Sequence, residues 1–168
     1  MLGYNFVSSY KPGAKGKYQL RVSPIRFKRM KQKVKEITRK TRPISFKERV
    51  IELNRYMKGW IGYFRYANMQ GKLQELDVWI RNRLRYCIWK HWKKPNKRMR
   101  SYIRMGISPG MAYAWSRSRM GGWPQACSPM MKTTVTVQRL KQRGYIEFAQ
   151  YFQRFDNSQQ LKFDFDFC

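Results

Sequence analysis

The sequence predicts a mainly α protein, with a three-helix bundle, shorter C-terminal helices and a small N-terminal β-hairpin. Two observations predict this class. Apolar residues recur at steps of three and four along three segments between residues 23 and 92, which is the spacing of one helix face. Proline, glycine and Ser-Pro pairs separate these segments and recur through the C-terminal half. With 42% apolar and 16% aromatic residues, the chain can also bury a core.

The N-terminal stretch is predicted to form a hairpin. Tyr4–Val7 and Lys17–Val22 are short runs with aromatic and β-branched residues, and they are separated by Pro12, Gly13 and Gly16. Two strands alone are marginally stable in water. We therefore expect the hairpin to lie on a helix or to join another sheet.

Ser23 and Pro24 begin the first predicted helix, because serine is a favoured cap and proline is favoured at the first helical position. Pro43 ends it. Basic residues occupy most positions outside a narrow apolar seam of Phe27, Met30, Val34 and Ile37. So many like charges on one short helix oppose folding unless anions lie nearby. We expect this helix to contact phosphate groups.

The second predicted helix, residues 45–67, has the clearest pattern. Ser45 and Glu48 have the spacing of a capping box, in which each side chain bonds the other residue's backbone amide. Gly59 and Gly62 lower the helix propensity, so we expect another element to approach closely there. The apolar stripe consists of Phe46, Val50, Leu53, Met57, Trp60, Ile61 and Phe64.

A third helix is predicted from Leu73 to about Trp92, after a break at Gly71. Asp77 and Arg81 lie one turn apart and predict an ion pair. The apolar stripe consists of Leu73, Leu76, Ile80, Leu84 and Ile88. Across the bundle, the residues predicted to form the structural core are Leu53, Trp60, Phe64, Ile80 and Leu84.

The C-terminal half is predicted to contain short helices. Gly121–Pro124 is expected to be a loop, and the C-terminal tail is expected to be poorly ordered, with Phe163–Phe167 as an added strand the alternative. Helices are predicted at residues 96–105, 108–117, 128–143 and 148–155. The chain would then divide into the hairpin at 1–22, the bundle at 23–94 and a C-terminal helical extension at 95–168.

Net charge is the most unusual property of the chain. Lys and Arg number 37 against 9 Asp and Glu, which gives a formal charge of +28. Residues 21–100 contain 25 basic and 5 acidic residues, so the charge is concentrated in the three long helices. A folded protein with this balance requires a polyanion, and a nucleic acid is the first inference.

No catalytic or metal-binding constellation is present. The chain has no glycine-rich phosphate loop and no nucleophile motif. Cys87, Cys127 and Cys168 are widely spaced and His91 is the single histidine, so neither a zinc site nor a disulfide framework is expected. Asp164 and Asp166 lie on the terminal tail, which offers no rigid frame for a metal pair. We expect no cofactor bound by the protein itself.

Basic residues interleaved with aromatic residues predict RNA binding, because cations meet phosphates while flat side chains stack on unpaired bases. The alternative is that the aromatic residues form the core. We favour the core for Trp60, Phe64 and Trp89, and both alternatives stay open for Tyr63 and Tyr66. The predicted RNA-binding residues are Arg26, Lys28, Arg29, Lys31, Lys33, Lys35, Arg55, Lys58, Tyr63, Arg65, Arg81, Arg83, Arg85, Lys90, Lys93, Lys94, Lys97 and Arg98.

The second and third predicted helices carry an ordered series of motifs: Leu53-Asn54, Gly59-Trp60, Tyr63-Phe64, Leu76-Asp77, Trp79-Ile80-Arg81, Arg83-Leu84-Arg85 and Trp89-Lys90-Trp92-Lys93. This series resembles the maturase-specific domain of group II intron-encoded proteins, also called domain X, which corresponds to the thumb of their reverse transcriptase. Leu2-Gly3-Tyr4 and the hairpin resemble the end of the palm subdomain. Pro124 departs from the family, in which a basic residue is expected.

The resemblance implies a protein that binds group II intron RNA and stabilises its splicing-competent fold, with Mg²⁺ expected on the RNA and not on the protein. Contact with a template–primer duplex is also implied. The Tyr-x-Asp-Asp string of reverse transcriptases and an endonuclease motif are absent from the sequence, so we do not expect an enzyme.

Two alternatives remain: a thumb subunit or fragment that works with a separate fingers-palm polypeptide, and a general basic RNA-binding protein. Because no membrane span or signal peptide is visible, we expect a cytoplasmic or organellar protein that is not secreted and has no membrane partner.

Overall fold

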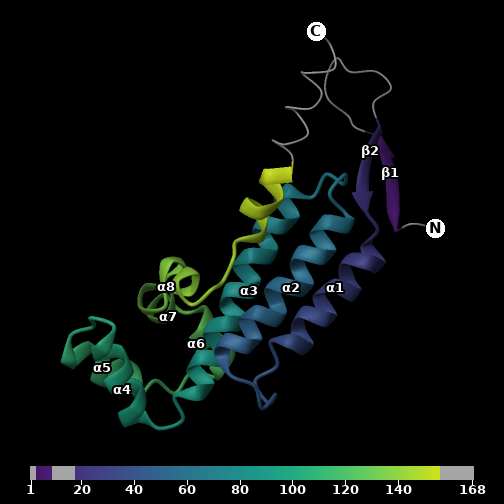
Figure 1. Ribbon diagram of the computed structural model, residues 1–168. Helices are drawn as coiled ribbons and strands as arrows, with labels where there is room; N and C mark the ends of the chain where they lie inside the picture. The colour runs from purple at the N-terminus through teal and green to yellow at the C-terminus, as the bar shows by residue number, and fades with distance from the viewer. Residues whose placement is uncertain (1–2, 9–17, 156–168) are drawn as a thin grey trace, which may run out of the picture. The chain divides into compact units, whose positions relative to one another are not determined.

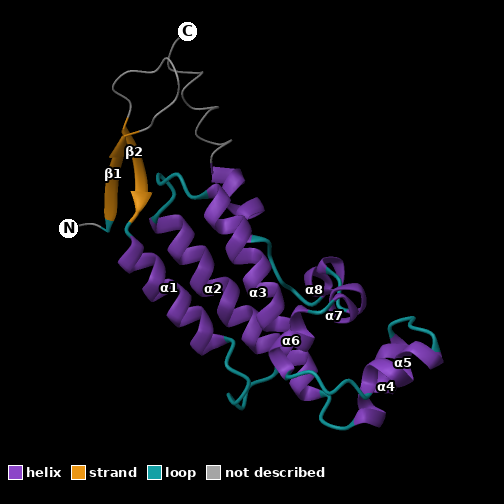
Figure 2. Cartoon of the chain, turned by 180° about the vertical axis from the view of Figure 1, so that it is seen from behind, coloured by secondary structure: helices purple, strands orange, loops and turns teal. Residues whose placement is uncertain are grey.

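The structure, a computed structural model, describes residues 3–8 and 18–155 (Figures 1 and 2). The predictions for the hairpin turn and for the tail after residue 155 lie outside the described residues. The predicted fold class is confirmed, because the described chain is mainly helical with one two-stranded antiparallel sheet. Its elements are β1 (Tyr4–Ser8), β2 (Tyr18–Val22), α1 (Pro24–Ile37), α2 (Phe46–Tyr63), α3 (Gln70–His91), α4 (Pro95–Arg104), α5 (Pro109–Ser116), α6 (Gly122–Cys127), α7 (Pro129–Thr134) and α8 (Val137–Gln142), and residues 148–155 are also helical.

The chain divides into two compact units. Unit 1 combines Met1–Glu36, Glu52–Asp77 and Ile146–Cys168, and unit 2 combines Ile37–Ile51 and Val78–Tyr145. The division falls within α2 and within α3, so each of these helices contributes to both units. The predicted boundaries after residues 22 and 94 were drawn from sequence signals, and they stay predictions.

In unit 1 the hairpin lies against helices, as expected. Tyr4 is paired with Val22 in the antiparallel register of β1 and β2. The Tyr4 hydroxyl donates to the Tyr63 carbonyl at the end of α2, with 2.6 Å between the oxygens. At Gly3 φ is +84°, and an added Cβ would lie 3.1 Å from Cγ of Arg26. Glycine at position 3 therefore allows the hairpin to meet α1 closely.

The core of unit 1 is formed where α1, α2 and the start of α3 lie side by side (Figure 1). Asp77 is buried and accepts hydrogen bonds from the backbone amides of Phe148 and Ala149, at 3.0 and 2.9 Å. These bonds satisfy two amides at the start of the last helical segment. The ion pair predicted between Asp77 and Arg81 stays a prediction. Buried apolar side chains of this unit include Met30, Val34, Leu53, Met57, Ile61, Leu73, Leu76 and Phe148.

The core of unit 2 is built around an aromatic cluster. Tyr102 is fully buried, and its ring centroid lies 5.5 Å from Trp92 and 5.7 Å from Trp115. Such edge-to-face pairs add to the hydrophobic gain of burial. Buried apolar residues around the cluster include Ile80, Leu84, Ile88, Trp89, Ala112, Met131 and Leu140.

The capping box at the start of α2 is confirmed. The Ser45 amide donates to Glu48 Oε2 at 2.9 Å, and the Glu48 amide donates to Ser45 Oγ at 3.1 Å. These bonds lower the pKa of the exposed Glu48 carboxyl from its ordinary value. The helix ends at Tyr63, four residues before the predicted end, and an Ala67 amide bond to the Phe64 carbonyl forms a turn there.

Several local predictions are wrong. Gly122 begins α6, so the expected loop at 121–124 is partly helical. The single helix expected at 128–143 is two helices, because Thr136 caps α8 by accepting from the Arg139 amide. The third helix begins at Gln70 and includes Gly71 in its first turn.

The prediction of close approach at two glycines of α2 is also wrong. A Cβ built at Gly59 or Gly62 would meet no atom within 4 Å among the described residues.

Among residues 3–8 and 18–155, no helix is long and apolar enough to cross a membrane.

Candidate nucleic-acid interface

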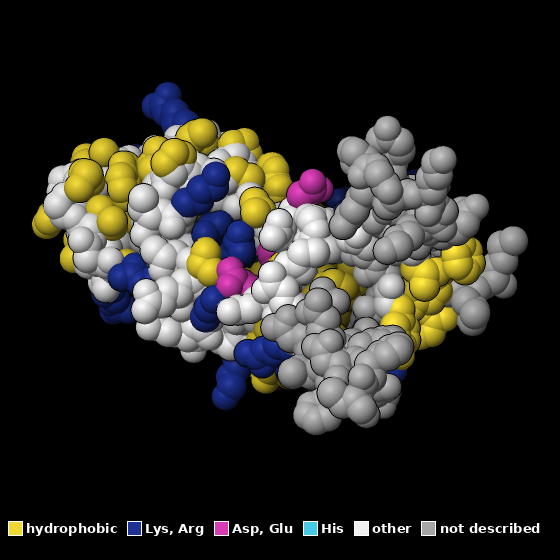
Figure 3. Space-filling model, turned by 90° about the horizontal axis from the view of Figure 1, so that it is seen from above, with side chains coloured by type: hydrophobic (Ala, Val, Ile, Leu, Met, Phe, Trp, Pro, Cys, Tyr) yellow, Lys and Arg dark blue, Asp and Glu magenta, His cyan; other side chains and the backbone are white. Residues whose placement is uncertain are grey.

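Most predicted RNA-binding residues carry exposed side chains. Arg81, Arg83 and Arg98 are half-buried, and Arg85 is buried. The exposed set is Arg26, Lys28, Arg29, Lys31, Lys33, Lys35, Arg55, Lys58, Tyr63, Arg65, Lys90, Lys93, Lys94 and Lys97. On the face drawn in Figure 3, Lys and Arg side chains gather at several points, and Asp and Glu cover little of the surface.

In unit 1 the basic residues of α1 form two stripes. At 100° per residue, Lys28, Lys31 and Lys35 share one side of the helix. Arg26, Arg29 and Lys33 share the other side, and the buried seam lies between the two stripes. Both stripes are solvent-exposed, so α1 can contact phosphates on either side.

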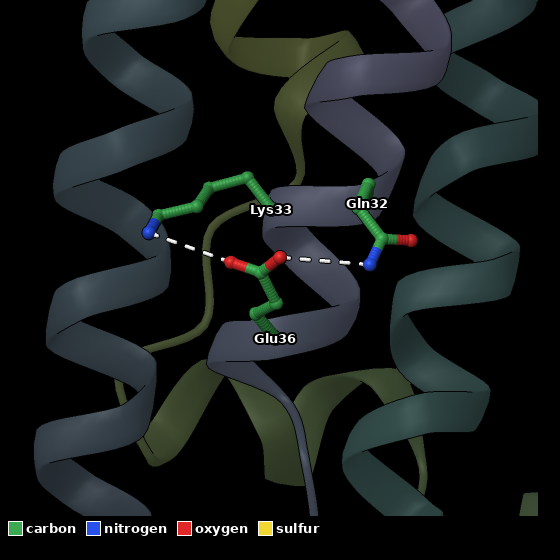
Figure 4. Close-up of polar contacts among 3 residues, drawn as sticks. All are labelled: Gln32, Lys33 and Glu36. Atoms are coloured by element: carbon green, nitrogen blue, oxygen red, sulfur yellow. Dashed lines mark hydrogen bonds and ion pairs between the residues drawn. The ribbon is translucent and has the colours of Figure 1, made fainter.

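Lys33 has an acidic partner on its own helix. Its Nζ lies 3.5 Å from Oε2 of Glu36, and Gln32 donates to the other carboxylate oxygen of Glu36 at the same distance (Figure 4). The Lys33 and Glu36 side chains are 54% and 53% exposed. An ion pair this exposed contributes little, so Lys33 can exchange Glu36 for a phosphate at small cost.

An aromatic pocket of about 260 Å³ lies between α1 and α2 in unit 1. Arg26 and Arg29 line it together with Trp60, Tyr63 and Phe64. Guanidinium groups beside open aromatic faces are an arrangement that suits phosphates and unpaired bases.

Tyr63 and Tyr66 of unit 1, for which the sequence left both a core and a surface position open, are exposed in the structure. Tyr63 is 56% exposed and Tyr66 is 55% exposed. Tyr4 stacks on Tyr63 with 6.4 Å between the ring centroids. Arg65 lies 4.7 Å from the Tyr66 ring centroid and donates to its hydroxyl. Both rings are therefore presented outside the core.

Among the predicted core residues, Leu53, Phe64, Ile80 and Leu84 are buried, and so is Trp89. Trp60 is half-buried, with its ring centroid 6.1 Å from Phe27 and 4.8 Å from Phe64. It lies at the edge of the core of unit 1 and also lines the aromatic pocket.

In unit 2, two arginines of α3 hold other segments of the chain in place. Arg85 is only 5% exposed, and its guanidinium donates to the Val135 carbonyl at 2.9 Å and to Asn82 Oδ1 at 3.0 Å. Arg83 donates to the Thr38 hydroxyl and lies 5.3 Å from the Trp79 ring centroid. Burial lowers the pKa of both guanidinium groups, yet arginine stays charged at neutral pH. We therefore remove Arg85 from the interface, because a buried side chain cannot reach RNA.

Helix α4 presents a groove lined only by polar residues. Its volume is about 560 Å³, and no acidic residue lines it. Arg98, in contrast, turns back to α3: it lies 4.0 Å from the Trp89 ring centroid and donates to the Trp92 carbonyl. The residues lining the groove are Lys94, Asn96, Lys97, Arg100, Ser101 and Arg104.

A second basic pocket in unit 2 was missed by the sequence analysis. It is lined by six Lys and Arg residues, among them Lys40, Arg42 and Arg143, which the predicted interface did not include. The basic run of α1 continues into Lys40 and Arg42 and could have indicated them. Arg104 of α4 could have been found from its helical spacing to Lys97 and Arg100. Arg143 carries no such signal, because only the fold brings it to this pocket.

A comparison with protein-family models found a match over part of the chain. Residues 27–105, which run from α1 to the end of α4, match the model of the group II intron maturase-specific domain. The resemblance drawn from the motif series is thereby confirmed, and it implies a group II intron maturase role. A search of curated proteins found no match to the chain.

The maturase-specific domain is a different part of such proteins from the catalytic reverse transcriptase core. Within residues 3–8 and 18–155, no group of three or more His, Cys, Asp or Glu side chains could hold a metal ion. The exposed cations and aromatic rings present positive charge beside flat apolar faces, an arrangement that suits nucleic acids.

Proposed function

We propose that the protein binds group II intron RNA and stabilises its splicing-competent fold. The match to the maturase-specific domain carries this proposal. The exposed cations of α1 and the cation-lined groove of α4 support it, because both surfaces are suited to phosphate contact. In this proposal the RNA performs the splicing chemistry with its own bound Mg²⁺, and the protein supplies binding energy.

The binding energy would act by shifting a population of RNA conformations. A protein can favour the folded intron only by the difference between its affinities for the folded and misfolded forms. If about eight phosphates are contacted, affinity falls by roughly 10³ to 10⁵ between ionic strengths of about 50 and 200 mM. Intron RNA recognition should therefore be measured at one fixed ionic strength.

The test is a competition experiment. Folded group II intron RNA and an unrelated structured RNA of equal length compete for the protein at fixed, moderate ionic strength. We expect the intron to win, and we expect the protein to raise the fraction of intron that splices at limiting Mg²⁺. Equal affinity for the two RNAs would reduce the protein to a general basic RNA-binding protein and contradict the proposal.

A second candidate function is that of a thumb subunit that binds template–primer duplex together with a separate fingers-palm polypeptide. The two-stranded sheet favours it, because each strand has a partner on one side only within the described residues. Phe6 on β1 is 75% exposed and would be covered by an added strand or sheet. Mixing the chain with a separately expressed fingers-palm protein and measuring cDNA synthesis tests this idea. Absence of both complex and cDNA would remove it.

A further inference from the structure

The second basic pocket, formed entirely by unit 2, has a more specific character than the other basic surfaces. Its volume is about 580 Å³, within the range of pockets that hold small ligands. No acidic residue lines it. Its cations come from α2, from α3 and from the segments that follow α1, α3 and α8: Lys40, Arg42, Arg49, Lys90, Lys93 and Arg143.

Arg49 builds one wall of this pocket. It is 4% exposed and donates to three backbone carbonyls, those of Ile37, Arg39 and Arg42. These bonds curl the segment after α1 around a buried guanidinium and hold Arg42 at the pocket. The acceptors carry no formal charge, so they leave the positive charge of Arg49 uncompensated and it adds to the potential inside the pocket.

Two lysines converge beside the pocket. Lys40 Nζ lies 5.7 Å and Lys90 Nζ lies 5.8 Å from the centroid of the Tyr86 ring. An added Cβ at Gly122 would lie 2.7 Å from Tyr86 Cε2 and 2.9 Å from Lys90 Cε, so α6 confines the side chains of Tyr86 and Lys90. Lys40 and Lys90 both line the pocket, and an anion bound there would offset part of their positive charge.

The pocket also offers a flat apolar face. Phe46, Ile44 and Trp92 contribute to its lining, and Phe46 is half-buried. The Arg143 guanidinium lies 5.7 Å from the Phe46 ring centroid. The groove of α4 differs, because no aromatic residue lines it. Cations alone suit a phosphate chain, whereas cations beside an aromatic ring and a guanidinium suit a phosphate with a base attached.

We propose that this pocket takes one unpaired nucleotide, with the phosphate near Lys40 and Lys90 and the base against Phe46 and Arg143. The nucleotide belongs to the RNA of the proposed function, on which this inference rests. A base inside a duplex is stacked and paired and cannot enter, so the pocket distinguishes single-stranded from double-stranded segments of the bound RNA.

The experiment compares binding of a fluorescein-labelled oligouridine and of a blunt RNA duplex by anisotropy at fixed ionic strength. Phe46→Leu keeps an apolar side chain and removes the ring. We expect it to weaken oligouridine binding by about fivefold or more and to leave duplex binding unchanged. Phe46→Tyr keeps an aromatic ring and should bind oligouridine with the affinity of the unaltered protein, which separates loss of stacking from loss of folding.

The matched control is Tyr113→Leu on α5. Tyr113 is 54% exposed and has the Arg117 guanidinium 3.5 Å from its ring centroid, so it has the same aromatic and arginine pairing outside the pocket. We expect this variant to bind oligouridine like the unaltered protein. Equal losses in the two leucine variants, or equal losses of oligouridine and duplex binding in Phe46→Leu, would overturn the inference.

Free ligands separate a nucleotide site from an anion site. AMP and inorganic phosphate are added as competitors of the labelled oligouridine, and we expect AMP to compete better, with Phe46→Leu removing its advantage. Equal competition by phosphate would leave only an anion site and overturn the proposal. A protein that passes these tests but fails to prefer intron RNA would refute the proposed function alone.

Discussion

Helices α1 and α3 carry similar runs of basic residues in the sequence, but the structure uses them differently. Every Lys and Arg of α1 from residue 26 to 35 is exposed. On α3, Arg83 is half-buried and Arg85 is buried, and both donate to groups on other segments of unit 2. A basic run therefore does not by itself identify an interface. The two helices differ in how much of their surface other segments of the chain cover.

The arginines of α3 are covered because later segments of the chain, among them α6 and the link between α7 and α8, pack against this helix. The Arg85 guanidinium bonds the Val135 carbonyl between α7 and α8, and Tyr86 of the same helix contacts Trp123 of α6. These later helices cover positions of α3 that would otherwise face solvent. Helix α1 buries a single narrow seam, so its flanking lysines stay available for phosphates.

The largest expected effect is the loss of Arg85. In Arg85→Ala the buried Val135 carbonyl loses its donor and a cavity remains, so the free energy of unfolding should fall by about 2 to 4 kcal/mol. Urea denaturation followed by circular dichroism measures it, with Lys28→Ala on α1 as the control expected to stay within about 0.5 kcal/mol. Equal stability of the two variants would contradict the view that α3 carries a structural arginine whereas the basic residues of α1 are exposed and not needed for folding.

The next effect concerns RNA affinity. Changing Lys28, Lys31 and Lys35 together to Gln removes three charges from one side of α1 and leaves its buried seam intact. We expect affinity for structured RNA to fall by roughly tenfold or more, and the slope of log K against log salt to shrink by about 2 to 3. Salt titrations of filter binding measure both quantities. An unchanged salt slope would show that this side of α1 does not contact phosphates.

The smallest expected change in stability concerns the hydrogen bond between Arg83 and the Thr38 hydroxyl. Thr38→Val keeps the volume of a fully buried side chain and removes the hydroxyl that accepts from Arg83. Because Arg83 also donates to the Thr38 carbonyl, the free energy of unfolding should fall by only about 1 kcal/mol. RNA affinity of the folded variant should not change. A clear loss of affinity would instead assign Arg83 to the interface as the sequence predicted.

Sequence patterns worked best where the determining interactions are local. The capping box of Ser45 and Glu48 is complete within four residues, and its two hydrogen bonds are present. Local spacing does not reveal a partner that is distant in the sequence. The Asp77 carboxylate accepts from the amides of Phe148 and Ala149, about seventy residues away, and no local pattern indicated these two bonds. Gly59 and Gly62 of α2 also show that a residue with low helix propensity need not mark a close contact between helices.

By itself, the sequence determined the class of fold, the family of residues 27–105 and the excess of positive charge. These properties depend on periodicity, motif order and composition, which a chain carries before it folds. Only the tertiary structure decided which cations stay exposed and which become part of the core. It also brought Lys40, Phe46, Lys90 and Arg143 to one pocket, because packing joins residues that are separated by more than a hundred positions and share no local pattern.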